Sequence, residues 1–147
     1  MVVISKTGQV YSDLRPLIRL AENCHFSKTL DPGILLTLDT PLSWLTGAML
    51  AQPLLVVEVV DCSDGRLFSL APVLRDQMSF RGELRATGSL LPDQFPSLIR
   101  CGFDSFQVPD ESDVDYALQV MQHAPDPGRY QQRYREQDSL RYRGGLA

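Results

Sequence analysis

The hydrophobic positions of this chain fall into short runs separated by polar turns, and four of these runs have the length of strands. Residues 34–38, 53–60, 82–88 and 103–108 are either almost wholly apolar or alternate between apolar and polar side chains, as strands do. Helical periodicity and N-capping residues occupy the stretches between them. Strand and helix therefore alternate four times, which predicts an α/β domain with a mainly parallel sheet.

Two architectures satisfy this alternation. One is an open sheet with helices on both faces, and the other is a half-barrel of four βα units. The strands begin 20 to 28 residues apart, which suits both. A half-barrel leaves one sheet face bare, so that alternative also predicts a homodimer. In either architecture the functional residues are expected beyond the carboxyl ends of the strands.

The helices are predicted from their end signals. Ser69 is the expected N-cap of the third helix, because Pro72 is tolerated only in a first turn. Gly102 is the expected C-cap of the fourth. The complete set of expected helices is 13–23, 40–50, 69–78, 93–100 and a last one that begins at Ser112.

The order of these elements predicts one domain with a tail. Residues 2–4 and 9–11 flank Lys6-Thr7-Gly8, which is typical of a short hairpin. The domain is expected over residues 1–124, with the hairpin and a helix in 1–30 and the βα units in 33–124. Residues 125–147 are rich in Arg and Tyr and contain few aliphatic side chains, and we interpret them first as a disordered tail that buries little. The alternative, functional interpretation is a tail that docks on an acidic partner or on a second copy of the chain.

Composition and charge narrow the class of protein. Apolar residues make up 44% and charged residues 22% of the 147 positions, as in soluble globular proteins. The formal net charge of −4 argues against nucleic-acid binding. No apolar run approaches the roughly 20 residues that cross a bilayer. Three scattered cysteines suit a reducing compartment, so we expect a cytoplasmic protein without a membrane anchor.

Motifs for bound cofactors are missing from the sequence. It has no glycine-rich phosphate loop, no dinucleotide fingerprint and no closely spaced cysteine pair, so we expect no cofactor. Asp39, Asp61 and Asp64 could meet as ligands of a hard cation. We disfavour that site, because Arg85 or Thr87 stands where a further strand-end carboxylate is expected, and we predict no metal.

Arginines supply the strongest chemical signal. Twelve of the fourteen basic residues are Arg, whose forked guanidinium group holds oxyanions at two points. The turn Asp64-Gly65-Arg66 lies at a strand-to-helix junction, Arg85 lies in the next strand, and Asp93-Gln94 opens the next helix. These residues form the candidate anion site: Asp64, Gly65, Arg66, Arg85, Asp93 and Gln94.

Each member of this set also has a purely structural interpretation. Asp64 can cap a helix, Gly65 can permit a turn, and Arg85 can pair with Glu83 or Asp93. In the functional interpretation, Arg66 and Arg85 converge on one sulfite, sulfate or phosphate.

Three sequence blocks carry a family resemblance. They are SDGRLFSLAPVLRD, FRGELRATGSLLPDQ and LIRCGFDSF, and they resemble an uncharacterised bacterial family that is encoded beside assimilatory sulfite reductase. Its members are described as oxidoreductases of sulfite reduction. The resemblance covers roughly residues 33 to 124. Four positions or segments depart from the family pattern, which marks a divergent member: Pro72, Ser89, Pro92 and the segment 59–62.

The resemblance implies a role in sulfur assimilation and leaves two hypotheses. The first is a non-catalytic accessory protein that binds sulfite reductase or its electron donor. The second is a small α/β enzyme or binding protein that holds an anionic substrate with Arg66 and Arg85. Convergence of Arg66, Arg85, Asp64 and Asp93 into one pocket would favour the second hypothesis, and their separation would favour the first.

Overall fold

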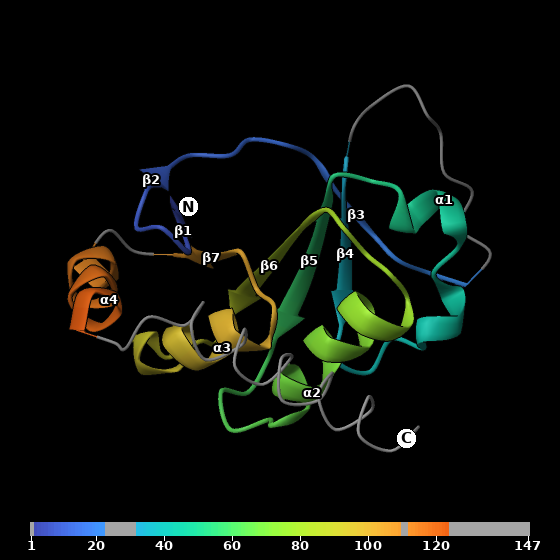
Figure 1. Cartoon of the computed structure of the whole chain (residues 1–147). Helices are drawn as coiled ribbons and strands as arrows, with labels where there is room; N and C mark the ends of the chain where they lie inside the picture. The colour runs from blue at the N-terminus through green and yellow to red at the C-terminus, as the bar shows by residue number, and fades with distance from the viewer. Residues whose placement is uncertain (1, 23–31, 110–111, 124–147) are drawn as a thin grey trace, which may run out of the picture.

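A computed structural model of the chain describes residues 2–22, 32–109 and 112–123. It contains one open sheet of seven strands in the order β2-β1-β7-β6-β5-β4-β3 (Figure 1). The strands are β1 (Val2–Ser5), β2 (Val10–Tyr11), β3 (Leu17–Arg19), β4 (Gly33–Thr37), β5 (Leu54–Val59), β6 (Glu83–Gly88) and β7 (Ser105–Val108). The open-sheet alternative is therefore confirmed, and the tail at 125–147 lies outside the described residues.

Five strands of the sheet are parallel. β3 to β7 follow one another in sequence and in space, and each pairs in parallel with the next. The four strands predicted from the hydrophobic runs are β4 to β7, so their parallel arrangement is confirmed. The predicted hairpin is also present: β1 pairs antiparallel with β2, and on its other side with β7.

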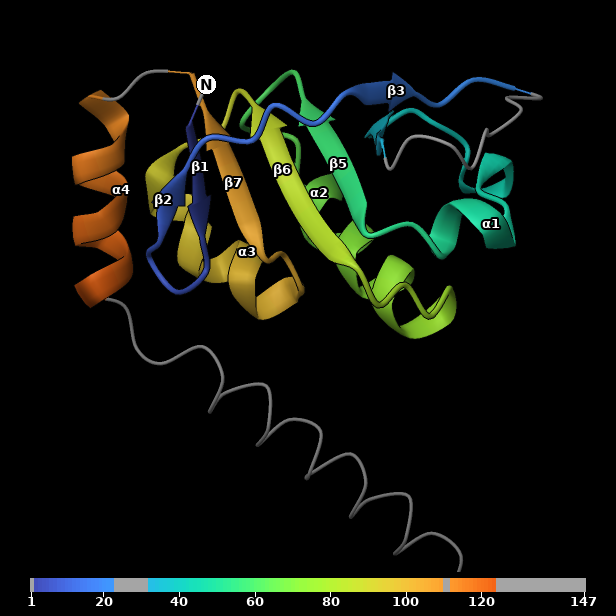
Figure 2. The ribbon, with the colours of Figure 1, turned by 90° about the horizontal axis from the view of Figure 1, so that it is seen from above.

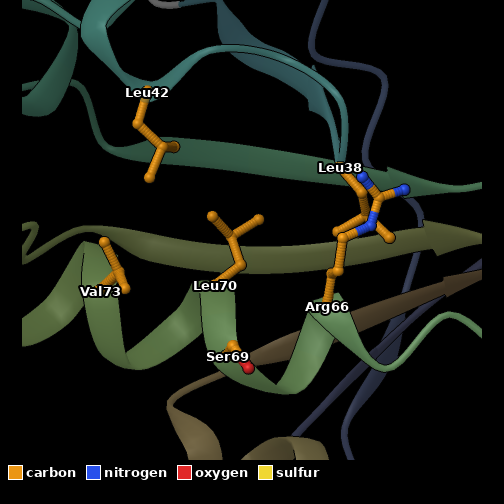
Figure 3. Close-up of a pocket in the computed structure, with 6 residues that line it drawn as sticks. All are labelled: Leu38, Leu42, Arg66, Ser69, Leu70 and Val73. Carbon is orange, nitrogen blue, oxygen red and sulfur yellow. The ribbon is translucent and has the colours of Figure 1, made fainter.

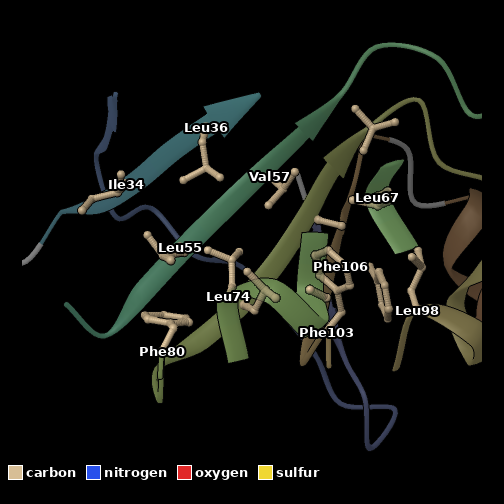
Figure 4. Close-up of a cluster of buried hydrophobic side chains, with 14 of the residues drawn as sticks. Ile34, Leu36, Leu55, Val57, Leu67, Leu74, Phe80, Leu98, Phe103 and Phe106 are labelled. Atoms are coloured by element: carbon tan, nitrogen blue, oxygen red, sulfur yellow. The ribbon is translucent and has the colours of Figure 1, made fainter. Parts of the chain in front are cut away.

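One face of the sheet carries the main core. Helices α2 (Arg66–Pro72) and α3 (Phe95–Cys101) lie against this face (Figure 2). Side chains from alternate residues of the strands point toward these helices and pack with the helices' apolar side chains in one continuous cluster (Figure 4). Phe95 and Phe106 stack there with ring centroids 4.1 Å apart, an arrangement that adds to the area they bury.

Among the described residues, one segment crosses the opposite face: residues 12–16, which we call the strap. It connects β2 near one sheet edge to β3 at the other, on the side away from α2 and α3 (Figure 2). Val56 of β5 and Arg85 of β6 are buried on this face. The open-sheet alternative expected helices on both faces, but the described helices cover only one. Parallel strands that neighbour each other in chain order place their right-handed crossovers on the same side of the sheet.

The helix predicted at residues 13–23 is wrong. Within the described residues this stretch is the strap followed by strand β3. Pro16 has no N–H to donate, and its carbonyl accepts a hydrogen bond from Gly33 N–H instead. The free edge of β4 offers Ile18 backbone partners, so tertiary pairing overrides the helical pattern.

The helix predicted at residues 40–50 is broken in two. A 3-10 helix, η1 (Leu42–Trp44), is followed by the single-turn helix α1 (Gly47–Leu50). Thr46 caps α1 through Met49 N–H at 3.4 Å, whereas Thr40 accepts a hydrogen bond from Thr37 N–H. The crossover between β4 and β5 therefore contains only these two short helices.

The third helix begins earlier than predicted. α2 starts at Arg66 instead of after Ser69, and Pro72 is its last residue. Pro72 cannot donate to the preceding turn, and the chain continues as a π-helix, η2 (Val73–Gln77), in which Met78 N–H reaches Val73 O at 3.0 Å. This wider turn absorbs a proline that an α-helix interior would not tolerate.

The last two predicted helices are confirmed. A 3-10 turn, η3 (Pro92–Gln94), leads into α3, which ends at Gly102 with a φ of 128°. Helix α4 (Ser112–His123) packs against α3 and η3. No helix among the described residues is long and apolar enough to cross a membrane.

Candidate functional site

Except for Arg85, which lies within β6, the polar candidates lie in or next to the loops at the carboxyl ends of the parallel strands. Residues 38–41 follow β4, residues 60–65 follow β5, and residues 89–94 follow β6. The second and third loops are joined, because Gln94 Nε2 donates to Cys62 O at 2.9 Å and Ser89 N–H donates to Val59 O at 2.8 Å. The sequence prediction that these loops share one edge is correct.

Arg66 forms the centre of a surface ion-pair cluster. Its Nε and Nη2 donate to both oxygens of Asp64 at 2.6–3.1 Å, and its Nη1 donates to Asp39 Oδ1 at 2.7 Å. Hydrogen bonds from Arg66 lower the pKa of Asp64, and hydrogen bonds to Asp64 and then Asp39 raise the pKa of Arg66. The side chain of Arg66 is 57% exposed, so these pairs position the loops more than they stabilise the fold.

Asp64 also organises the start of α2. Its Oδ1 accepts from Arg66 N–H at 3.1 Å, although the N-cap of α2 is Gly65 and not the predicted Asp64. Gly65 behaves differently from expectation, because its φ is −68° and a Cβ built on it would meet no atom within 4 Å. A side chain is therefore compatible with this turn.

Arg85 is a buried cation on the opposite face of the sheet. Its side chain is 3% exposed and its Nη2 donates to Asp13 Oδ2 at 2.8 Å and to Glu83 Oε1 at 2.9 Å. Ser105 Oγ accepts from its Nε at 3.3 Å and donates to the same Glu83 oxygen at 2.6 Å. Burial lowers the pKa of Arg85, but the hydrogen bonds to Asp13 and Glu83 outweigh it and raise the pKa.

Two carboxylates thus neutralise Arg85, and one of them comes from the strap. Tyr11 Oη adds a hydrogen bond to Glu83 Oε1 at 3.2 Å. Burial and then Glu83 raise the pKa of this phenol. The network fastens the strap across the sheet, and the predicted pairing of Arg85 with Glu83 is confirmed.

Asp93 and Gln94 have structural partners at the edge. Asp93 Oδ1 accepts from Tyr116 Oη of α4 at 2.8 Å, which raises the pKa of Tyr116. Gln94 Oε1 accepts from Leu91 N–H at 3.2 Å. These contacts hold α4 and η3 together.

The structure does not bring the six candidate residues into one pocket. Arg66 projects from α2 on the helical side, whereas Arg85 points to the strap side, because its neighbours Leu84 and Ala86 fill the helical-side core. Asp93 contacts α4 instead of either arginine. Anion binding by these residues stays a prediction, and both arginines already have carboxylate partners.

An apolar groove opens beside Arg66. It lies between α2 and the segment that follows β4, and Leu42 points across it toward Leu70 and Val73, with Arg66 and Leu38 at one end (Figure 3). Ser69 completes the lining. The volume of the groove is about 210 Å³, below the roughly 300–1,000 Å³ of pockets for small molecules.

Sequence reasoning missed an arginine that makes more hydrogen bonds to the backbone than Arg66 or Arg85 does. Arg75, in η2, donates to the carbonyls of Phe80, Gly82 and Gly102 at 2.7–3.1 Å and pairs with Asp104. It joins the two loops that lead into β6 and β7 at the amino end of the sheet. Its predicted position inside a helix gave no signal of these contacts, because they depend on how the two loops fold back toward η2.

No three His, Cys, Asp or Glu side chains in residues 2–22, 32–109 and 112–123 are grouped so that they could hold a metal ion.

Comparison with curated proteins and with solved structures gives no match to the chain. A family model does match, over residues 33–141, and it covers the βα units, their carboxyl-end loops and the segment beyond α4. The chain therefore belongs to the family described as bacterial protein of unknown function (DUF934).

Proposed function

We propose that this protein is a non-catalytic accessory protein of sulfite reduction, which acts by binding sulfite reductase or its electron donor. The separation of Arg66 and Arg85 onto opposite sides of the sheet carries this proposal. The two hypotheses from the sequence differ in whether these arginines converge, and their separation favours the binding protein. The pathway rests on the resemblance of the three sequence blocks to a family encoded beside sulfite reductase.

Electrostatics supports the same choice. An anionic substrate would have to displace Asp13 or Glu83 from Arg85, which is buried. Removing one partner of a buried ion pair costs about 3–5 kcal/mol, so such a site would bind weakly. Arg66 is accessible, but Asp39 and Asp64 leave the cluster with a net negative charge, which repels an anion.

Affinity purification tests the proposal. A tagged full-length chain is mixed with lysate of the source bacterium grown on sulfate, and bound proteins are identified by mass spectrometry. We expect subunits of sulfite reductase or of its electron donor to be enriched over a tagged unrelated protein of similar charge. Equal recovery with both baits would contradict the proposal, as would sulfite turnover by the purified chain alone.

Calorimetry tests the alternative of an anion-binding protein. Sulfite, sulfate and phosphate are titrated into the wild type and into Arg66→Ala and Arg85→Ala. We expect no binding at millimolar ligand. Binding by the wild type that both substitutions weaken tenfold or more would overturn our choice in favour of the anion site.

A further inference from the structure

The carboxyl edge of the sheet carries exposed apolar side chains that the fold does not use. Val60, directly after β5, is 81% exposed, and Leu91, after β6, is 50% exposed. They lie in the two loops that the Gln94–Cys62 hydrogen bond joins. The apolar groove opens at the same edge, where Leu38 follows β4. The groove, Val60 and Leu91 together form what we call the edge surface.

The edge surface is acidic. Loops 38–41, 60–66 and 89–94 contain four Asp and one Arg. That arginine is already paired with two of the four carboxylates. Asp39 is next to Leu38 in the chain and pairs with Arg66, both of which line the groove, and it remains 83% exposed. Asp61 and Asp93 are also exposed. Apolar side chains surrounded by unbalanced negative charge are complementary to an apolar segment that carries basic residues.

The size of the groove identifies what enters it. About 210 Å³ is too small for a typical small-molecule ligand, but a single large side chain needs only part of that space. Leu42, Leu70 and Val73 would surround such a side chain (Figure 3). An apolar anchor in a pocket with charges at the rim is the usual centre of a protein–protein interface.

We propose that the edge surface docks a segment of a partner protein in which one large aliphatic or aromatic side chain is flanked by Arg or Lys. The anchor enters the groove, and the basic side chains face Asp39 and the neighbouring carboxylates. The proposal rests on the proposed function as a binding protein, and it adds the location of the contact and the chemistry of the partner.

Short synthetic peptides test this chemistry directly. The first probe is a Gly/Ser peptide that carries one Phe between pairs of Arg. Its twins replace either the Arg residues by Glu or the Phe by Ser. Fluorescence anisotropy with the full-length chain at low salt should rank the basic-apolar probe at least about tenfold tighter than both twins. No measurable binding, or equal binding of the three probes, would overturn the proposal.

Matched variants locate the binding site. Asp39→Asn should weaken the basic-apolar probe about two- to fivefold, as expected for an exposed charge contact, and Leu70→Ala about fivefold or more. Gln77→Lys makes the same charge change at the far end of the helical segment, and Leu118→Ala truncates a partly buried leucine of α4. Both controls should bind like the wild type, and their melting temperatures show whether each variant is folded. Equal weakening by variants and controls would contradict the assigned surface.

Two further results separate this proposal from the proposed function. If Leu70→Ala and Asp39→Asn still enrich sulfite reductase from lysate as the wild type does, the edge surface is wrong and the proposed function stands. If the probe binds as expected but no component of sulfite reduction is enriched, the edge surface stands and the proposed function fails.

A peptide of residues 126–147, which is basic and contains Tyr and Leu, is a fourth probe. Tighter binding of it than of the basic-apolar probe would overturn an external partner in favour of the chain's own tail.

Discussion

Replacing Arg75 by Met should strongly destabilise the protein. Met keeps much of the apolar stem but removes every donor. The carbonyls of Phe80, Gly82 and Gly102 then lose their hydrogen bonds, and Asp104 loses its ion pair.

The magnitude follows from these four lost contacts. A typical hydrogen bond contributes about 1 kcal/mol net, and one to a charged group about 1.5–3 kcal/mol. The side chains of Arg75 and Asp104 are only about one-fifth to one-quarter exposed, so water can replace the lost donors in part. We expect a loss of about 3–4 kcal/mol, which lowers Tm by roughly 10 °C in a chain of this length.

Urea denaturation followed by circular dichroism measures this loss. Arg81, which is exposed on the adjoining loop, supplies the control: Arg81→Met should change stability by less than about 0.5 kcal/mol. Arg75→Lys keeps the charge but not the fork, so it should retain the pair with Asp104 and lose most carbonyl contacts. Stability of Arg75→Met within about 1 kcal/mol of the wild type would refute our account of this arginine.

Three other predictions concern the sheet and the strap. Leu84→Ala should cost about 2–5 kcal/mol in urea denaturation, because this side chain is fully buried; a smaller loss would remove it from the core. Gly88→Ala should destabilise by more than about 1 kcal/mol, since its φ is +98° and a Cβ would lie 2.2 Å from a carbonyl oxygen of β5, whereas Gly65→Ala should be neutral or stabilising in the same assay. Burial raises the pKa of Asp13, but the hydrogen bonds from Arg85 and Arg15 outweigh burial, so the pKa is lowered overall. The ionised carboxylate of Asp13 therefore stabilises the fold at pH values above the ordinary Asp pKa. This contribution is lost as the pH falls through the lowered pKa of the folded state. The melting-temperature difference between the wild type and Asp13→Asn should therefore shrink below about pH 4, and a constant difference down to pH 2 would contradict this.

The alternation of strands and helices could be predicted because the parallel strands from β4 to β7 are mostly built from buried apolar residues that are consecutive or alternate in the sequence. β5 is the clearest case: Leu54 to Val57 are inaccessible from either side, as a continuous apolar run implies. The alternation in β6 also placed Leu84 and Ala86 on one face and Arg85 on the other. From β3 to β7 the strand order follows the chain order, as is usual where crossovers join strands that neighbour each other in sequence; the place of β1 beside β7 does not follow from chain order.

The misplaced elements depended on contacts between distant residues. β3 exists because β4 has a free edge, and local periodicity at 13–23 holds no information about that edge. Arg85 pairs with Asp13, which lies 72 positions away in the sequence. The sequence of β6 alone therefore could not show whether Arg85 binds a substrate or forms this ion pair. Residue type alone made Arg66 and Arg85 candidates for holding an anion, but they point to opposite sides of the sheet and therefore do not share a site.

The strap has a consequence for how the chain is made. β1 pairs with β7, and Val3 lies opposite Gln107, so β1 can pair with β7 only after about 100 further residues have been made. At about 5–20 residues per second this delay lasts several seconds. The hairpin with β2 can form at once, but Arg85 must be in place before Asp13 can fasten the strap. The amino-terminal segment should therefore be the last part to become protected from proteases during synthesis, and a nascent chain arrested before β7 should leave it open to cleavage.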